Sequence, residues 1–413
     1  MSHKYKYIIV PIIILVLVIM SLYFILFAYG NKPDPASEVA GKKWAANVLR
    51  KYPNDLNEED YAKIKDVEFH GMELKDIRFI EKFTNLEKLD IQNIRFPKSE
   101  VPSWMHLLAK IKLIDLKKRF SLDLSPLEKL PNLEMLVIYT PVKNIKPFKN
   151  MTNLKELHLV YNVSDLRPIK YLKNLNELTL DQDESFNLEI IKDLNKLQRL
   201  NLFSTPVSNF EPVKNLTNLQ YLDISLSNVS DLGPVKNLEN LQTLKISKQI
   251  SELEPLRNLK NLKELVLNGT KVTDLDPISG LVNLEILTLR NNNILNVTPL
   301  RNLTKLQKLD IYEFKVSDIG SLSELLNLSQ LKLLNTPVKS LEPLRKMTKM
   351  QTLTLDLSNV TDLTPLMGMV NLKNVIFKNC DHITEKQITD LQKALPKVRN
   401  LFYKSSGGVS YIR

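Results

Sequence analysis

A leucine pattern that returns every 21 or 22 residues constrains this chain more than any other feature. One unit occupies residues 219–240 and reads LQYLDISLSNVSDLGPVKNLEN. Leu222, Asp223 and Ile224 predict a short strand, because alternate side chains of a strand point to opposite faces. The chain then turns at residues 228–233 and returns along the outer side. A strand and a return limb of this size cannot close a core alone, so the unit is stable only when stacked on copies of itself.

The leading apolar residues of the units show how far the repeat extends. They lie at Leu86, Ile111, Leu133, Leu154, Leu175, Leu197, Leu219, Leu241, Leu262, Leu284, Leu306, Leu328, Met350 and Leu372. A proline keeps the same period in most return limbs. Chance does not produce two such registers, so we predict a stack of repeats over residues 67–371.

Both ends of the repeat array depart from the pattern. Residues 38–66 hold two short helical segments, the second with Asn57 as its N-cap, and should cover the open edge of the first repeat. A further helix is expected at residues 102–110, where the step between units is longer. Residues 372–404 should form a C-terminal capping repeat with a helix at 384–394 and a strand at 398–403. We expect a flexible tail at residues 405–413.

The repeat consensus is LxxLxL, then Thr, Ser or Asn, then V-S/T-D-L-x-P-L-x-N-L-x-N. It resembles the short leucine-rich repeat of bacterial internalin-like proteins, and the lead-in WAANVLRKYPNDLNEEDYAKIKDVEF resembles their N-terminal cap. The resemblance covers about residues 38–371. It implies an α/β leucine-rich-repeat solenoid: a curved stack with a concave parallel sheet, irregular and 3-10 convex limbs, and a helical N-terminal cap. It also implies a protein-binding role.

The N-terminal segment points to a membrane. Residues 7–30 carry no charged side chain, and at ~1.5 Å per residue they exceed the ~30 Å hydrocarbon core. We expect an uncleaved anchor within residues 1–30, with a cleaved signal peptide and secretion as the alternative. Residues 31–37 should form a stiff linker. Lys4 and Lys6 favour a cytoplasmic N-terminus with the repeats outside the cytoplasm, whereas a cytoplasm-facing scaffold needs the opposite orientation.

Catalytic motifs are absent from the sequence: it contains no G-x-S-x-G, H-E-x-x-H or G-x-x-x-x-G-K-[ST]. The five histidines are scattered, and none is spaced with carboxylates as a metal site. Cys380 is the single cysteine, which gives neither a disulfide framework nor a cysteine-based metal site. We therefore expect no enzyme, no metal and no cofactor.

Side chains between the strand leucines should face out of the concave sheet. One predicted apolar patch comprises Leu113, Met135, Val137, Tyr139 and Val160. A second group comprises Arg290, Tyr312, Phe314, Lys332 and Leu334, and Phe203 and Tyr221 lie between the two. Exposed aromatic residues and arginine form the centres of interfaces, so this face is predicted to bind a protein. The alternative is that these are ordinary sheet residues.

The net charge of +11 suggests anionic partners, although no nucleic acid is expected. A basic row should lie on the outer surface, two residues after each proline position, at Lys149, Lys170, Lys192, Lys214, Lys236, Arg257, Arg301 and Arg345. An acidic row at Asp165, Asp231, Asp274, Asp318 and Asp362 could neutralise part of its field. The basic row would contact an anionic envelope polysaccharide or a lipid surface. Alternatively, it is a solvated row whose stems cover apolar surface.

Overall fold

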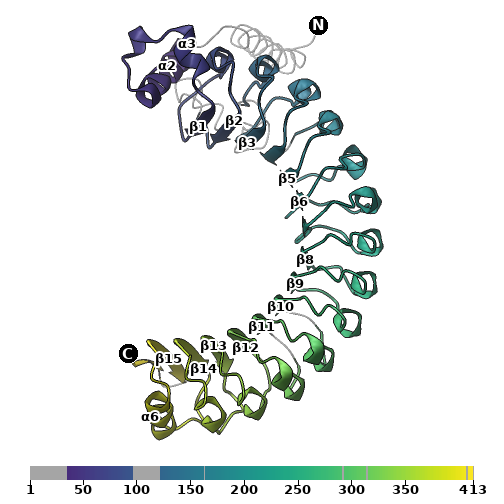
Figure 1. Cartoon of the computed structure of the whole chain (residues 1–413), viewed down its shortest axis with the longest axis vertical. Coiled ribbons are helices and arrows are strands. Elements are labelled where there is room, and N and C mark those ends of the chain that lie inside the picture. The colour runs from purple at the N-terminus through teal and green to yellow at the C-terminus, as the bar shows by residue number, and fades with distance from the viewer. Residues whose placement is uncertain are drawn as a thin grey trace, which may run out of the picture.

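The computed structural model describes residues 35–95, 121–161, 163–290, 293–312, 315–405 and 408–412. Over this part of the chain, one sheet of sixteen strands runs in sequence order from β1 to β16. Figure 1 shows the strands on the inner side of a C-shaped stack and the short return helices on the outer side. The predicted membrane segment, the helix at 102–110, Leu113 and Phe314 lie outside the described residues. Within them, no helix has the length and apolar character needed to cross a membrane.

The strands of the sheet have these bounds: β1 Asp66–His70, β2 Lys88–Gln92, β3 Met135–Tyr139, β4 Glu156–Val160, β5 Glu177–Asp181, β6 Arg199–Asn201, β7 Tyr221–Asp223, β8 Thr243–Ser247, β9 Glu264–Asn268, β10 Ile286–Arg290, β11 Lys308–Tyr312, β12 Gln330–Leu334, β13 Thr352–Asp356, β14 Asn374–Lys378, β15 Asn400–Ser405 and β16 Gly408–Ile412. Strands β1 to β15 pair in parallel, and equivalent residues of successive repeats lie side by side, as Leu222 does with Leu244. Both leucines are fully buried, so the core is a continuous stack of apolar layers.

The return limbs contain short 3-10 helices on the convex side: η3 Arg78–Lys82, η5 Ser125–Lys129, η6 Lys146–Asn150, η7 Arg167–Tyr171, η8 Leu188–Ile191, η9 Glu211–Asn215, η10 Gly233–Val235, η11 Glu254–Leu256, η12 Asp276–Ile278, η13 Thr298–Asn302, η14 Gly320–Glu324, η15 Glu342–Leu344 and η16 Thr364–Leu366. Most begin with a proline in the first turn, where its missing N–H costs no hydrogen bond. The predicted 3-10 convex limbs are therefore confirmed.

The predicted acidic row has a structural role in these limbs. The Asp231 carboxylate accepts a hydrogen bond at 2.7 Å from the backbone N–H of Gly233, which closes a turn before η10. The other members of the row make the same bond to the residue two positions on: Asp165, Asp274, Asp318 and Asp362. Each aspartate therefore sets the start of a return limb.

The N-terminal cap consists of α2 Pro35–Leu49, η2 Pro53–Asp55 and α3 Glu58–Ala62. Helix α2 begins inside the segment 31–37 that we predicted as a linker. Its first turn packs onto the repeats: Ser37 is buried, and its Oγ accepts a hydrogen bond from the Lys75 N–H at 2.8 Å. Gly41 faces the Phe79 ring, which would clash with any Cβ at that position. Proline suits the first turn of a helix, so Pro35 starts α2 and does not stiffen a linker.

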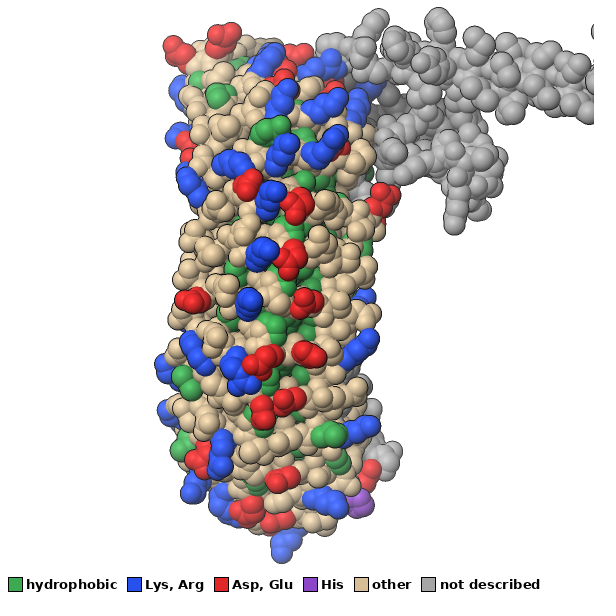
Figure 2. Space-filling model, turned by 90° about the vertical axis from the view of Figure 1, so that its right-hand side faces the viewer, with side chains coloured by type: hydrophobic (Ala, Val, Ile, Leu, Met, Phe, Trp, Pro, Cys, Tyr) green, Lys and Arg blue, Asp and Glu red, His purple; other side chains and the backbone are tan. Residues whose placement is uncertain are grey.

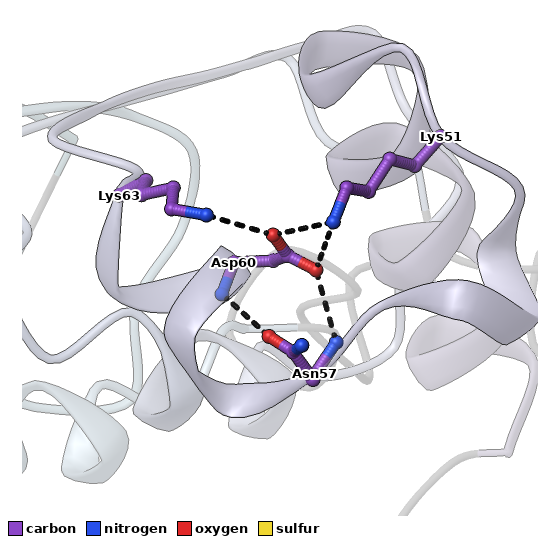
Figure 3. Close-up of polar contacts among 4 residues, drawn as sticks. All are labelled: Lys51, Asn57, Asp60 and Lys63. Carbon is purple, nitrogen blue, oxygen red and sulfur yellow. Dashed lines mark hydrogen bonds and ion pairs between the residues drawn. The ribbon is translucent and has the colours of Figure 1, made fainter.

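Helix α3 is held by polar contacts at its first turn (Figure 3). The Asn57 side chain accepts a hydrogen bond from the Asp60 N–H at 2.9 Å, and the Asp60 carboxylate accepts one from the Asn57 N–H at 3.2 Å. Asp60 also pairs with Lys51 at 2.8 Å and Lys63 at 3.1 Å. Hydrogen bonds from Lys51 and then Lys63 lower the pKa of Asp60 to about 2. The sequence-based prediction that Asn57 caps this helix agrees with these contacts.

The C-terminal end contains helix α6 Glu385–Ala394, capped by Thr384, followed by β15. The prediction of a flexible tail at 405–413 is wrong for residues 408–412. Strand β16 pairs antiparallel with β15, and its Ile412 lies beside Leu401. The outer edge of β15 would otherwise present a row of unpaired N–H and C=O groups, and the returning strand satisfies them.

Candidate functional site

The N-terminal half of the concave face contains the first predicted patch. Met135, Val137 and Tyr139 lie on β3, and Val160 ends the adjacent strand β4. Val137 is only 5% exposed, whereas the other three side chains are half-buried. Burial, with a smaller contribution from Asp90, raises the pKa of Tyr139. The patch is therefore apolar, but most of its area is already covered by its own neighbours.

The centre of the concave face carries the most exposed of the predicted aromatic residues that the structure describes. Phe203, just after β6, is 45% exposed. Tyr221 begins the next strand, β7, opposite Arg199 in the register. It is half-buried, and the Arg199 guanidinium lies 4.2 Å and the Lys245 Nζ 5.4 Å from the centre of its ring. Cations over an aromatic face are attracted by the ring quadrupole, so Tyr221 is held in one orientation. We call Phe203, Tyr221, Arg199 and Lys245 the central aromatic cluster; its two cations are also paired, Arg199 with Glu177 at 3.2 Å and Lys245 with Glu264 at 3.9 Å.

The second predicted group is organised by Asp310, an aspartate that is not among the predicted site residues. Asp310 is buried on β11, with its carboxylate 2.6 Å from the Arg290 guanidinium and 3.7 Å from the Lys332 Nζ. Tyr312 is half-buried between Arg290 and Leu334 in the strand register. Burying a carboxylate destabilises the fold unless the charge is paired. Arg290 and Lys332 therefore neutralise Asp310 in addition to facing the solvent. The repeat period aligns Asp310 with Lys332 on neighbouring strands, so the sequence could have indicated this ion pair.

A histidine cluster lies on β4 and β5. His158 Nε2 is 3.0 Å from Glu156 Oε1 and 3.5 Å from Glu177 Oε1. One ligand atom from each residue lies within 4.8 Å of the other two. The sequence analysis found no histidine spaced with carboxylates as for a metal ion. Strand pairing brings Glu177 beside His158, 19 positions earlier in the chain, so this arrangement is not visible in the sequence spacing.

The basic row is partly neutralised. Four of its members pair with a glutamate three residues earlier: Lys192 with Glu189 at 2.9 Å, Lys214 with Glu211 at 2.7 Å, Arg257 with Glu254 at 2.6 Å, and Arg345 with Glu342. Lys170 Nζ lies 5.0 Å from the centre of the Tyr171 ring, and Lys149, Lys236 and Arg301 are exposed. Figure 2 shows blue and red side chains next to one another along the convex side. This face therefore presents mixed charge.

A second basic surface lies at the edge where the strands begin. A groove of about 710 Å³, here called the basic groove, precedes strands β10 to β15 and is lined by Glu285, Lys305, Gln307, Asn327, Ser329, Lys349, Gln351, Asn371, Lys373 and Lys397. The Lys349 Nζ donates to the Asn327 Oδ1 at 2.6 Å, and Asn327 donates its amide to the Thr304 carbonyl at 2.8 Å. These bonds fix the lining side chains, which were not among the predicted site residues.

The repeats, the parallel sheet and the return limbs define a leucine-rich-repeat fold. Residues 239–280 and 260–302 match the family model of leucine-rich repeats in two copies. An internalin of Listeria monocytogenes, InlF, is 23% identical in sequence; the match covers 87% of this chain and 93% of that one, with a TM-score of 0.63. The fold of this chain is therefore internalin-like.

Two further structures share this fold. A leucine-rich-repeat protein of Leptospira interrogans is 20% identical over 83% of this chain and 97% of its own, with a TM-score of 0.65. The plant peptide hormone receptor RGFR1, solved in complex with RGF2, is 17% identical over 83% of this chain and 50% of its own, with a TM-score of 0.52. Among curated proteins, none matches this chain.

Proposed function

We propose that this chain is a non-catalytic binding module that holds a protein partner on its concave face. The observation that carries the proposal is the central aromatic cluster, in which Phe203 is exposed after β6 and Tyr221 on the neighbouring strand β7 is contacted by two cations. Rigid aromatic residues and arginine supply large contact areas at low entropic cost, which is why they dominate interface energetics. Leucine-rich repeats commonly bind proteins, and the receptor RGFR1 with its bound RGF2 is an example of this fold.

The test begins with a photo-crosslinking residue placed at position 203 of the full-length chain. A protein captured there is then measured for affinity against the double variant Phe203→Ser, Tyr221→Ala. We expect the dissociation constant to rise at least about tenfold, which corresponds to about 1.4 kcal/mol. The matched control is Leu326→Ser, because Leu326 is also 45% exposed but lies between η14 and β12. Equal affinity of the double variant and the wild type would contradict the proposal.

The proposed location follows from the N-terminal sequence. The uncharged residues 7–30 support a membrane anchor, and Lys4 and Lys6 support an orientation with the repeats outside the cytoplasm. A single N-terminal anchor is sufficient to hold a binding module at the membrane surface. The test fuses, after Arg413, a reporter that is active only outside the cytoplasm. We expect activity, and an inactive reporter would show that the repeats face the cytoplasm.

A second candidate function is binding of an anionic polysaccharide in the basic groove. Four lysines and one glutamate line it, together with amide side chains that hydrogen-bond well to sugar hydroxyls. The groove follows successive repeats, so a linear polymer could contact equivalent side chains along its length. Half of the basic row pairs with a glutamate, which makes the groove the stronger candidate for a polyanion.

The test compares two triple variants that remove the same charge. The first variant replaces three of the four groove lysines: Lys305→Gln, Lys349→Gln, Lys373→Gln. The second replaces three members of the basic row: Lys192→Gln, Lys214→Gln, Lys236→Gln. We expect the first variant alone to lose binding to dextran sulfate, with neutral dextran as the negative control. Binding by the wild type should fall steeply as salt rises, because the Debye length shrinks from ~10 Å at 0.1 M to ~3 Å at 1 M. A loss confined to the second variant would favour the basic row instead.

A further inference from the structure

We propose that Glu156, His158 and Glu177 form a zinc(II) site on the concave face. All three side chains lie on β4 and β5, on the same side of the sheet. One imidazole nitrogen and two carboxylate oxygens are established donors for zinc, and catalytic-type sites hold the ion with three protein ligands and one open position. The site adjoins the central aromatic cluster through Arg199, which contacts both Glu177 and the Tyr221 ring, but it does not depend on the proposed partner.

The strand register creates the site. Glu156 and Glu177 are direct partners in the β4–β5 ladder, so their carboxylates emerge side by side from neighbouring strands. Like charges at directly opposed positions destabilise a sheet. His158 lies two residues after Glu156 and therefore projects from the same face. A cation bound among the three donors would relieve the repulsion between the two glutamates.

The distances fit a small metal ion. Zinc bonds of about 2.0–2.2 Å in tetrahedral geometry place neighbouring ligand atoms roughly 3.3–3.5 Å apart. His158 Nε2 lies 3.0 Å from one glutamate oxygen and 3.5 Å from the other. All three donor atoms lie within 4.8 Å of one another, and movement of the glutamate side chains would bring them to the separations of a tetrahedral site. The backbone that carries them is paired sheet, which holds them in place.

Two further observations favour a bound cation. The Nε2 atom of His158 is buried and makes no hydrogen bond within the described residues, although two carboxylates lie beside it. The Arg199 Nε contacts Glu177 Oε2 at 3.2 Å, which leaves Oε1 directed at the histidine. Such outer contacts orient metal-binding carboxylates and raise metal affinity. Imidazole with carboxylate selects zinc and similar transition metals over magnesium or calcium, which prefer oxygen donors alone.

The experiment titrates untagged full-length chain with zinc chloride by calorimetry, and repeats the titration with cobalt(II) followed by visible absorption. We expect one equivalent to bind, with the intense absorption of tetrahedral cobalt. His158→Gln and Glu177→Gln should each weaken the affinity by about tenfold or more. The matched control is His70→Gln, because His70 Nε2 lies 3.0 Å from a single carboxylate oxygen of Asp90 on the same face. It should bind zinc as the wild type does.

Several results would overturn the site. Wild-type protein that takes up no zinc at all would show that His158 simply bridges the glutamates as an imidazolium. Unchanged affinity in His158→Gln, or an equal loss in His70→Gln, would place the bound metal elsewhere. Thermal melts of each variant establish that it is folded. If His158→Gln does not fold, Glu156→Gln, which changes one oxygen to an amide, is titrated in its place.

Discussion

At the scale of single residues, the backbone turn after each strand is the most demanding position of the repeat. Several repeats place a residue with positive φ there: Asn93, Ser204, Leu226, Lys248, Gly269 and Asn335. Glycine and asparagine adopt this conformation readily, whereas a leucine places its Cβ close to the following carbonyl oxygen. Leu226, with a φ of 60°, therefore carries local strain of about 1–2 kcal/mol.

Replacing Leu226 with asparagine should stabilise the protein. Asparagine occupies the equivalent turn position at residues 93 and 335, and Leu226 is partly exposed, so little apolar contact is lost. We expect the free energy of unfolding to rise by about 0.5–1 kcal/mol, measured from the midpoint of urea unfolding. Leu295→Asn is the control, because Leu295 is also exposed but its φ is negative. An equal gain in both variants would show that strain is not the cause.

At the scale of elements, short helices in this protein depend on side chains at their ends. Helix α3 has five residues, too few to be stable by its own backbone hydrogen bonds. Asp60 connects it to Lys51 after α2 and to Lys63 after α3, as Figure 3 shows. The lowered pKa of Asp60 means that these contacts stabilise the folded state only while the carboxylate is ionised.

The stability of the N-terminal cap should therefore fall in acid. The pKa of Asp60 is about 2 in the folded chain and near 3.8 in the unfolded chain. The unfolded chain binds more protons between these values, so this contribution is complete above about pH 4 and is lost as the pH falls towards 2. Asp60→Asn should unfold more easily at pH 7 and show a smaller further loss between pH 4 and 2.

Amide exchange in α2 and α3, or limited proteolysis at that end, would report the change. The control is Asp55→Asn, which removes an exposed acidic side chain from η2 without touching the lysine contacts. If both variants lose the same stability over the same pH range, the effect belongs to net charge and not to the Asp60 contacts.

The return limbs are elements whose structure is determined by a few adjacent residues. The D-L-x-P pattern of residues 231–234 combines a turn-forming aspartate with a proline in the first turn of η10, and both act within four residues. From the sequence alone, the same aspartates are predicted only to neutralise part of the basic row. Their hydrogen bonds to the backbone explain why they recur.

At the scale of the whole molecule, each end of the stack closes the sheet in a different way. Helices α2 and α3 cover the first repeat, where Trp44 packs its ring 5.4 Å from that of Phe69. At the other end, α6 precedes the last parallel strand, β15, and the antiparallel strand β16 follows it. An array of repeats needs such caps, because every inner repeat buries its apolar faces only against its two neighbours.

The sequence alone determined the stacked fold, the period, the buried leucines and both helical caps. The repeat period and the alternation of apolar and polar residues can be read directly from the sequence. A buried Leu222 needs an apolar layer on each side, and the neighbouring repeats supply Leu200 and Leu244 at the equivalent positions. The same signal located the concave row of Phe203 and Tyr221. These features follow from local pattern and simple stacking, so no tertiary information was needed.

Only the tertiary structure decided which side chains meet across repeats. His158 meets Glu177, and Asp310 meets Arg290 and Lys332, through strand pairing between residues about 20 positions apart in the chain. Whether such neighbours touch depends on their rotamers and burial, and the packing of the assembled sheet sets both. The same packing also decides which basic side chains are neutralised. On the convex side several members of the basic row come within reach of a glutamate, whereas the lysines of the basic groove contact mainly amide side chains.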